Sequence, residues 1–212
     1  MHPDYLSNAY LVADKEGGVA VYVDSGAPLE PLRAAAERWR VEPRFVLRTH
    51  SHHDHVEHEA KLGVPVRTDA VEVGGLHVEA MSTPGHSDDM VAFVVNDEAV
   101  FTGDTLFKGS VGGGNFEQVK QSVMDVLLAL PHRLRVLPGH SEETTLAREW
   151  DENPFVRVWR GVEPEGTERV RVAGAEATLV VWSPDYDGGG KAWVRFDDGR
   201  DAIVGGSRIQ RS

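Results

Sequence analysis

The sequence contains no cysteine, and this absence excludes several classes of protein. Disulfide-stabilised folds, thiolate zinc fingers, iron–sulfur clusters and enzymes with a cysteine nucleophile are all ruled out. Any metal ion that the chain binds must therefore be held by histidine, aspartate or glutamate side chains.

Long hydrophobic runs and an excess of positive charge are also missing. No apolar run approaches the roughly 20 residues that a membrane-spanning helix needs, and the first ten residues lack the basic region and apolar core of a secretory signal. With 22 Lys and Arg against 34 Asp and Glu, the formal net charge is −12, which disfavours binding to a nucleic-acid backbone. We therefore expect a cytoplasmic protein that binds neither membranes nor nucleic acids, and the oligomeric state is left open.

The 212 residues suit one domain with a small appendage. Up to residue 161, strand-like and helix-like segments are interspersed, which is typical of an α/β fold. Beyond it, only short strand-like segments follow, separated by turn signals at residues 187–190 and 197–199. The sequence predicts an α/β domain over residues 1–161 and a small β-rich domain, SH3-like or a ribbon, over residues 162–212.

Apolar residues at helical spacing predict helices over residues 28–40, 115–130 and 142–150. Asn115 is a suitable N-cap for the second helix. In the first domain we expect strands over residues 9–13, 19–24, 45–48, 64–68, 76–81, 91–96, 99–102 and 134–137. In the second we expect them over residues 169–172, 177–182, 192–196 and 202–204.

Histidine is the unusual residue in the composition. The chain has ten, and four of them, His50, His52, His53 and His55, fall within six residues that follow a predicted strand. Side chains two apart on an extended chain point the same way, so His50 and His52 can close on one metal ion. Asp54 and His55 begin the next turn and can face a second ion.

Three more predicted strands lead into a turn that contains glycine and a side chain able to bind metal. The strand at 76–81 leads to His86, the strand at 99–102 leads to Asp104, and the strand at 134–137 leads to His140. Sites built from loops at the carboxyl ends of strands follow the same plan. The candidate metal ligands are His50, His52, Asp54, His55, His86, Asp104 and His140.

These motifs together resemble the metallo-β-lactamase superfamily, and within it the glyoxalase II-like branch. The residues that carry the resemblance are Asn8-Ala9-Tyr10, Asp24-Ser25-Gly26, Thr49-His50-Ser51-His52-His53-Asp54-His55, Thr83-Pro84-Gly85-His86, Phe101-Thr102-Gly103-Asp104-Thr105-Leu106-Phe107 and Pro138-Gly139-His140. The resemblance implies a four-layer αββα sandwich, with two mixed sheets face to face, helices outside and two divalent metal ions at one edge.

The resemblance also implies a role for each ligand. His50, His52 and His86 match the first metal site, Asp54, His55 and His140 match the second, and Asp104 matches the carboxylate that bridges both. Asp24 matches a position that orients a ligand without binding the metal.

A site of this kind hydrolyses an ester, thioester, lactam or phosphodiester with hydroxide generated at the metal ions. Asp54 is the expected catalytic residue, because it can orient the hydroxide or accept its proton. Zinc is the expected metal, and iron and manganese take the same ligands. The branch implies a small-molecule acyl thioester as substrate. The strand-like tail differs from the helical C-terminal domain of true glyoxalase II enzymes. Whether the thiol of the substrate is glutathione is therefore left open.

Two other enzyme functions remain possible on the same scaffold. A mononuclear iron enzyme similar to the persulfide dioxygenases would hold its metal with His50, His86 and Asp104. A nuclease of the superfamily would share the histidine motif, but the net negative charge disfavours it.

A binding module is an alternative of a different class. Trp182, Trp193 and Phe196 would then form an aromatic patch on the β-rich domain. We expect them instead to form the core of that domain or to dock it onto the first domain. His53 is expected to lie among the ligands without binding metal, and surface positions are expected for His2, His58, His77 and His132.

Overall fold

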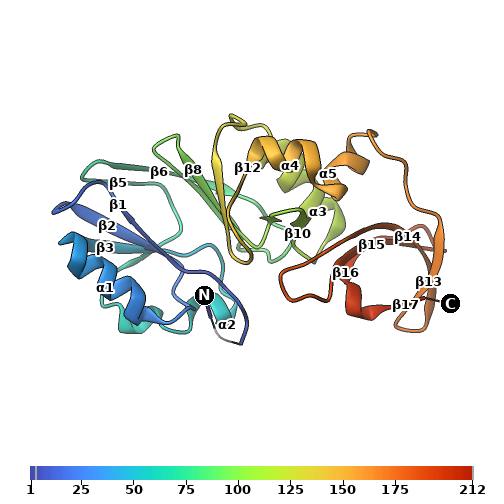
Figure 1. Cartoon of the computed structure of the whole chain (residues 1–212), viewed down its shortest axis with the longest axis horizontal. Coiled ribbons are helices and arrows are strands. Elements are labelled where there is room, and N and C mark those ends of the chain that lie inside the picture. Colours follow the sequence, from blue (N-terminus) through green and yellow to red (C-terminus); the bar gives the residue numbers. More distant parts are fainter. Residues whose placement is uncertain (3, 212) are drawn as a thin grey trace.

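The computed structural model describes residues 1–2 and 4–211. The N-terminal part forms a four-stranded sheet in the order β1-β2-β3-β4. Its strands are β1 (Tyr10–Ala13), β2 (Val19–Val23), β3 (Glu42–Leu47) and β4 (Val66–Arg67). β1 and β2 pair antiparallel, whereas β2, β3 and β4 run parallel. Helix α1 (Leu29–Trp39) connects β2 to β3 along the outer face of this sheet (Figure 1).

A six-stranded mixed sheet lies against the first and has the order β12-β11-β8-β7-β6-β5. Its strands are β5 (Val71–Val73), β6 (Leu76–Ser82), β7 (Val91–Val95), β8 (Ala99–Gly103), β11 (Arg135–Pro138) and β12 (Thr144–Thr145). β8 and β11 run parallel, and the other pairs are antiparallel.

Alternation along the strands creates the layers. Val21 and Val23 of β2 face inward and pack with Phe93 and Phe101 of the second sheet. Ala20, which directly precedes Val21, instead packs toward α1 with Ala36 and Val41. Both sheets therefore carry apolar residues on two faces, which is what a sheet buried between a helix and another sheet requires.

Helices cover the outer face of the second sheet. They are α3 (Phe116–Gln121), the π-helical turn η2 (Ser122–Leu127), α4 (Leu146–Glu152) and α5 (Pro154–Trp159). Their buried side chains, among them Val119, Leu127 and Phe155, share one core cluster with Val94 and Val100. The four-layer αββα arrangement predicted from the resemblance is confirmed.

Two predicted helices differ in detail from the observed ones. Asn115 caps α3 as expected, accepting a bond from the Gln118 N–H, but the helix then widens, and the Leu128 N–H donates to the carbonyl five residues back. The helix predicted over residues 142–150 begins only at Leu146, because Thr144 and Thr145 pair with β11 as strand β12. Helix α5 was not predicted.

The C-terminal residues form a five-stranded antiparallel sheet in the order β16-β15-β14-β13-β17. Its strands are β13 (Glu168–Val172), β14 (Ala175–Ser183), β15 (Lys191–Phe196), β16 (Asp201–Gly205) and β17 (Ile209–Arg211). The sheet curls at one end of the molecule, opposite the N-terminal sheet (Figure 1). The remaining short elements are α2 (His53–Val56), η1 (Glu59–Lys61), β9 (Leu106–Phe107), β10 (Ser110–Val111) and η3 (Gly206–Arg208).

The C-terminal sheet contributes to two cores. One face encloses a small cluster that includes Val170 and Val194, with Phe196 packed against it. The other face brings Trp193 and Ile203 into the large cluster under the helices. Trp193 is 4% exposed and Trp182 is 45% exposed, so Trp193 docks the sheet while Trp182 faces solvent. The boundary at residue 161 stays a prediction.

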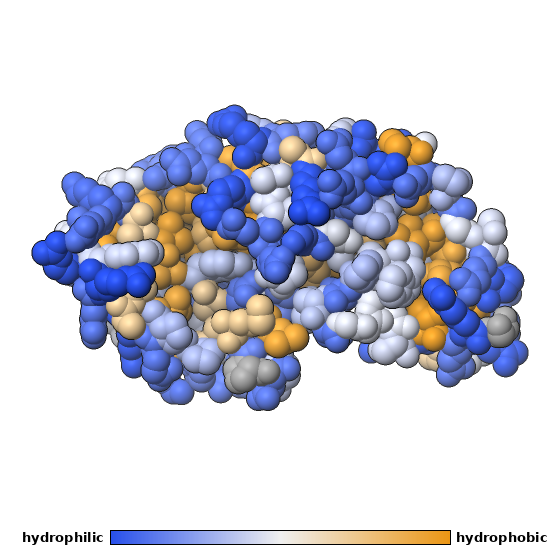
Figure 2. All heavy atoms as spheres, in the orientation of Figure 1, coloured by the Kyte–Doolittle hydropathy of each residue, from blue (hydrophilic) through white to orange (hydrophobic). Residues whose placement is uncertain are grey.

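No helix in the described part of the chain has the length and apolar character needed to cross a membrane. The surface in Figure 2 is mostly polar and is hollowed between the body and the C-terminal sheet.

Replacing Trp193 with alanine tests whether the C-terminal sheet and the body unfold together. We expect Trp193→Ala to lower the free energy of unfolding by about 3–5 kcal/mol, since it empties a buried aromatic site. Trp182→Ala is the matched control and should change it by less than about 0.5 kcal/mol. Urea unfolding followed by circular dichroism measures both. An unchanged main transition in Trp193→Ala would show that the sheet does not stabilise the body.

Candidate metal centre

The predicted ligands follow the ends of four strands. β3 ends at Leu47 and leads to the histidine cluster, where α2 carries Asp54 and His55. β6 leads to His86, β8 to Asp104 and β11 to His140. Because β3 and the other three belong to facing sheets, the ligands meet where the edges of the two sheets come together.

The structure brings all seven predicted ligands into three overlapping groups, in each of which the potential ligand atoms lie within 4.8 Å of one another. The groups are His50, His52 and His86; His50, His55 and Asp104; and Asp54, His55 and His140. The first and third have no member in common and correspond to the two predicted metal sites.

Asp104 lies between these two groups. Its Oδ1 is 3.4 Å from His55 Nε2, and its Oδ2 is 3.5 Å from His86 Nε2 and 3.2 Å from His140 Nε2. The two oxygens therefore face imidazoles from both groups, which is the placement that a bridging carboxylate needs.

The inner part of the centre is buried. His50, His55, Asp104 and His140 are at most 5% exposed, whereas His52 is exposed at the mouth. Within the described residues, His55 Nε2 and Asp104 Oδ1 are buried without a hydrogen-bond partner. Buried polar atoms left without a hydrogen bond are costly, and a cation would satisfy both. The residues present therefore fit a divalent metal with His and Asp ligands.

Asp24 fixes the orientation of the His55 ring and of the backbone at Thr49. Its Oδ1 accepts a bond from the Thr49 N–H (2.8 Å), and its Oδ2 lies 2.9 Å from His55 Nδ1 and accepts a bond from the Thr49 hydroxyl. A donor bond from Nδ1 turns His55 Nε2 toward the candidate metal position. Asp24 has a φ of 56°, and this left-handed conformation is one that aspartate tolerates.

A backbone carbonyl orients the ring of His86, and a hydrogen bond from Tyr10 holds the turn that precedes His140. His86 Nδ1 lies 2.9 Å from the Gly113 carbonyl, which leaves Nε2 directed at Asp104. The Tyr10 hydroxyl donates to the Pro138 carbonyl (2.6 Å) and steadies the turn before His140.

Close backbone approach explains Gly139. A Cβ on this residue would meet the Asp104 carboxylate and the ring of His55. Only glycine allows β11 to end this close to the ligands. This requirement explains the glycine at the centre of the motif Pro138-Gly139-His140.

The protein environment changes the pKa values of the buried groups. Burial lowers the pKa of His50 to about 3. Burial also opposes protonation of His55, but the hydrogen bond to Asp24 and the charges of Asp24, Asp104 and Asp54 outweigh it and raise its pKa to about 9. Burial disfavours ionisation of Asp104, yet its contacts with His140, His55 and His86 hold the pKa of its carboxyl well below the usual value. Without metal, the raised pKa of His55 thus favours a protonated imidazole beside the buried carboxylates.

The histidines outside the ligand set take varied positions. His53 and His77 are exposed, and His58 and His132 are half-buried. The prediction of a surface position is wrong for His2, which is 7% exposed. Its Nε2 lies 3.1 Å from Glu57, and its Nδ1 accepts bonds from the N–H groups of Asp4 and Tyr5. This contact folds the N-terminal segment back onto the helix that carries Asp54.

Sequence reasoning missed one residue at the centre. The ring of Tyr186, from the loop between β14 and β15, stacks on His140 with centroids 4.0 Å apart and planes 8° from parallel. Phe107 meets the same imidazole edge-on at 5.8 Å. Tyr186 sits beside a turn in the C-terminal segment, and no pattern in the sequence indicates its contact with a ligand.

No family model matches the sequence, but individual proteins do. An uncharacterized protein of Mycobacterium tuberculosis is 31% identical over 206 residues, covering 70% of this chain and 92% of the relative. A cytoplasmic hydroxyacylglutathione hydrolase of Arabidopsis thaliana is 34% identical over 162 residues, covering 62% of each chain.

Solved structures share the fold. The BLEG-1 B3 metallo-β-lactamase matches with a TM-score of 0.67 and 25% identity, over 73% of this chain and 96% of that one. ETHE1 from Myxococcus xanthus matches with a TM-score of 0.61 and 30% identity, over 71% and 80%. TTHA1623, solved in a di-iron-bound form, matches with a TM-score of 0.61 and 32% identity, over 73% and 98%.

The chain belongs to the metallo-β-lactamase superfamily. Membership of this superfamily and the cluster of His and Asp side chains indicate an enzyme.

Removing the charge of Asp24 tests its orienting role. We expect Asp24→Asn to weaken metal binding by about 10- to 100-fold, because the amide no longer fixes the His55 ring through a charged acceptor. Asp125→Asn, at an exposed carboxylate of η2, is the control and should bind as the wild type does. Competition against a chromogenic chelator measures both affinities. Equal affinities would show that Asp24 supports only the fold.

The metal-free protein should lose stability as the solution becomes alkaline. The pKa of His55 is raised from 6.5 to about 9. Its protonated form therefore stabilises the fold fully below pH ~6.5, and this contribution is lost as the pH rises through ~9. Metal binding favours neutral imidazole, so the metal-loaded protein should not show this loss. Calorimetric Tm values across this range, with and without chelator, measure the difference; parallel curves would contradict a protonated His55.

Proposed function

We propose that the chain is a dinuclear metal-dependent hydrolase of acyl thioesters. The observation that supports this most directly is the pair of separate three-ligand groups with Asp104 between them. Two-metal hydrolases hold their ions about 3.5–4 Å apart, and one carboxylate that faces both groups suits that separation. His50, His52 and His86 would hold one ion, Asp54, His55 and His140 the other, and Asp104 both.

Divalent cations in these positions would supply an activated water and would polarise a substrate carbonyl. The residues of the chain provide the rest of the reaction environment. The Asp54 side chain is 20% exposed, and its Oδ2 lies 3.5 Å from both His55 Nε2 and His140 Nε2. It therefore reaches solvent and the inner ligands at once, and we propose that it orients the attacking water or accepts its proton.

Several observations favour a thioester. The chain has no cysteine nucleophile, so the proposed attack is by water, and a thiolate departs without strong acid assistance. The Arabidopsis relative is named as a hydroxyacylglutathione hydrolase, and its name also supports our proposal of a cytoplasmic location. Zinc is our proposed metal. Iron is the alternative that the di-iron form of TTHA1623 supports.

A mononuclear iron enzyme similar to the persulfide dioxygenases is the second candidate, and the likeness to ETHE1 favours it. That function would require His50, His86 and Asp104 to surround one ion. His50 shares one group with His86 and another with Asp104, and Asp104 Oδ2 lies 3.5 Å from His86 Nε2, but a single ion there would leave the separate group of Asp54, His55 and His140 without a metal. The geometry therefore favours the dinuclear hydrolase.

Metal content and a substrate panel test the proposal together. The protein purified without added metal should hold two ions per chain. It should hydrolyse S-lactoylglutathione or another small acyl thioester faster than a chromogenic β-lactam, a phosphodiester or a lactone. Asp54→Asn should lower kcat by about 10²- to 10⁴-fold while circular dichroism shows an unchanged fold. Asp125→Asn should keep full activity.

Other outcomes would identify other functions. One iron per chain with oxygen consumption on glutathione persulfide would support the dioxygenase. Preference for the β-lactam or the phosphodiester would replace the substrate class and leave the ligand assignment standing. Undiminished turnover by Asp54→Asn would remove its catalytic role.

A further inference from the structure

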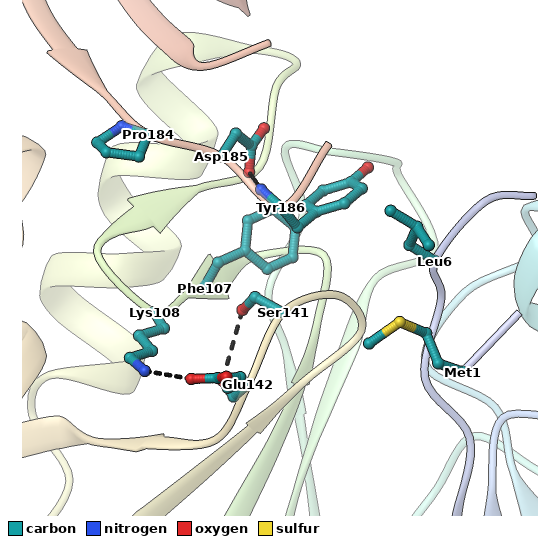
Figure 3. Close-up of a pocket in the computed structure, with 9 residues that line it drawn as sticks. All are labelled: Met1, Leu6, Phe107, Lys108, Ser141, Glu142, Pro184, Asp185 and Tyr186. Carbon is teal, nitrogen blue, oxygen red and sulfur yellow. Dashed lines mark hydrogen bonds and ion pairs between the residues drawn. The ribbon is translucent and has the colours of Figure 1, made fainter. Parts of the chain in front are cut away.

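A cavity of about 320 Å³ adjoins the candidate metal centre. Leu6, Phe107, Pro184 and Tyr186 supply its apolar walls, and Figure 3 shows the rings of Phe107 and Tyr186 side by side within it. The same two rings contact His140, so they form the partition between the cavity and the metal centre. The volume is at the lower end of the range for small-molecule sites, roughly 300–1,000 Å³.

The C-terminal sheet builds this partition, and several contacts fix its position. Asp185, whose side chain is 3% exposed, forms an ion pair with Lys191 at 2.9 Å and accepts a bond from the Tyr186 N–H at 3.0 Å. Ser183, at the end of β14, donates to the Ser110 hydroxyl of β10 in a buried contact of 3.1 Å. These contacts hold the loop in place on both sides of Tyr186. One of them reaches β10, which belongs to the segment that follows Asp104.

The charged side chains at the cavity are balanced. Lys108 pairs with Glu142 at its rim (Figure 3), and Asp185 pairs with Lys191. Among the side chains of this lining, each carboxylate thus has a cationic partner, and Lys108 has a carboxylate. A carboxylate-bearing ligand would therefore find no unpaired basic side chain among the described residues of this lining, whereas an apolar chain could pack against its apolar walls.

We propose that this cavity is a specificity pocket for an uncharged, apolar chain of the substrate, with Tyr186 of the C-terminal sheet as its specificity-determining residue. The inference rests on the proposed thioester hydrolysis and adds the part of the substrate that the C-terminal sheet selects. The stacked ring of Tyr186 contacts the chain on the cavity side and His140 on the other. An apolar chain has two possible sources, the acyl group and the thiol.

Two matched substrate series separate these sources. In the first, the thiol is N-acetylcysteamine and the acyl group is butanoyl or succinyl, which have equal carbon number but differ in charge. In the second, the acyl group is acetyl and the thiol is butanethiol or 4-mercaptobutanoate, which also have equal carbon number. In the series whose varied group occupies the cavity, the uncharged substrate should have a kcat/KM at least about tenfold higher than that of the charged substrate.

Substitutions in the C-terminal part of the chain test whether Tyr186 causes that preference. Tyr186→Ala should raise KM for the preferred substrate by about tenfold, leave kcat less affected and reduce the discrimination against the charged analogue. Tyr186→Phe keeps the ring and should retain the discrimination. Trp182→Ala, also an aromatic truncation in the C-terminal sheet but outside the cavity, is the control. Metal content per chain, measured for every variant, should stay at the wild-type value.

The outcomes distinguish this inference from the proposed function. If Tyr186→Ala discriminates against the charged analogue as strongly as the wild type does, the inference is overturned. Loss of metal from Tyr186→Ala would also overturn it, because Tyr186 would then serve only to support His140. If the wild type hydrolyses no thioester, the proposed function fails, and ketone analogues with CH₂ in place of sulfur still test the pocket by calorimetry. Tighter binding of the uncharged ketones, abolished in Tyr186→Ala, supports the pocket; equal binding overturns it.

Discussion

The burial of Asp104 among imidazoles is the interaction on which the rest of the structure depends. A carboxylate that is 5% exposed and lies 3.2–3.5 Å from ring nitrogens of His55, His86 and His140 is stable only if every partner keeps a fixed orientation. The surrounding contacts provide this. Asp24 fixes His55, the Gly113 carbonyl fixes His86, and Tyr10 holds the turn that precedes His140.

The meeting of two sheets at one edge makes this concentration of ionisable groups possible. Each ligand segment follows directly from a strand whose apolar side chains are buried, so the backbone that presents the ligand is rigid. Close approach is the second requirement. A Cβ at Gly26 would collide with the Asp54 carbonyl, and one at Gly139 with Asp104. Both glycines lie in segments that bring separate parts of the chain together behind the ligands.

The C-terminal sheet is integrated with the body through packing and hydrogen bonds. The ring of Trp193 packs against Phe116 with centroids 4.8 Å apart and planes tilted by 35°, and both belong to the core cluster beneath the helices. Hydrogen bonds join Glu149 and Asn153 of the helical layer to the backbone of Gly109 and Ser110, and the Ser110–Ser183 contact extends this network to β14. The loop that carries Tyr186 therefore has a fixed position relative to the metal centre, which a flexibly tethered module would not provide.

The sequence by itself determined the fold class and which seven side chains gather, because these features reside in local patterns. Strand alternation, the Asn115 cap and the motifs around His50, His86, Asp104 and His140 are all readable within a few residues. Tertiary structure decided the rest. Thr144 and Thr145 became a strand because β11 offered an unpaired edge, overriding their place in a helical pattern. His2 is buried because Glu57, 55 residues away, pairs with it. Tyr186 reaches His140 only because Trp193 and Ser183 dock the C-terminal sheet, and no local pattern encodes a contact made by packing between distant segments.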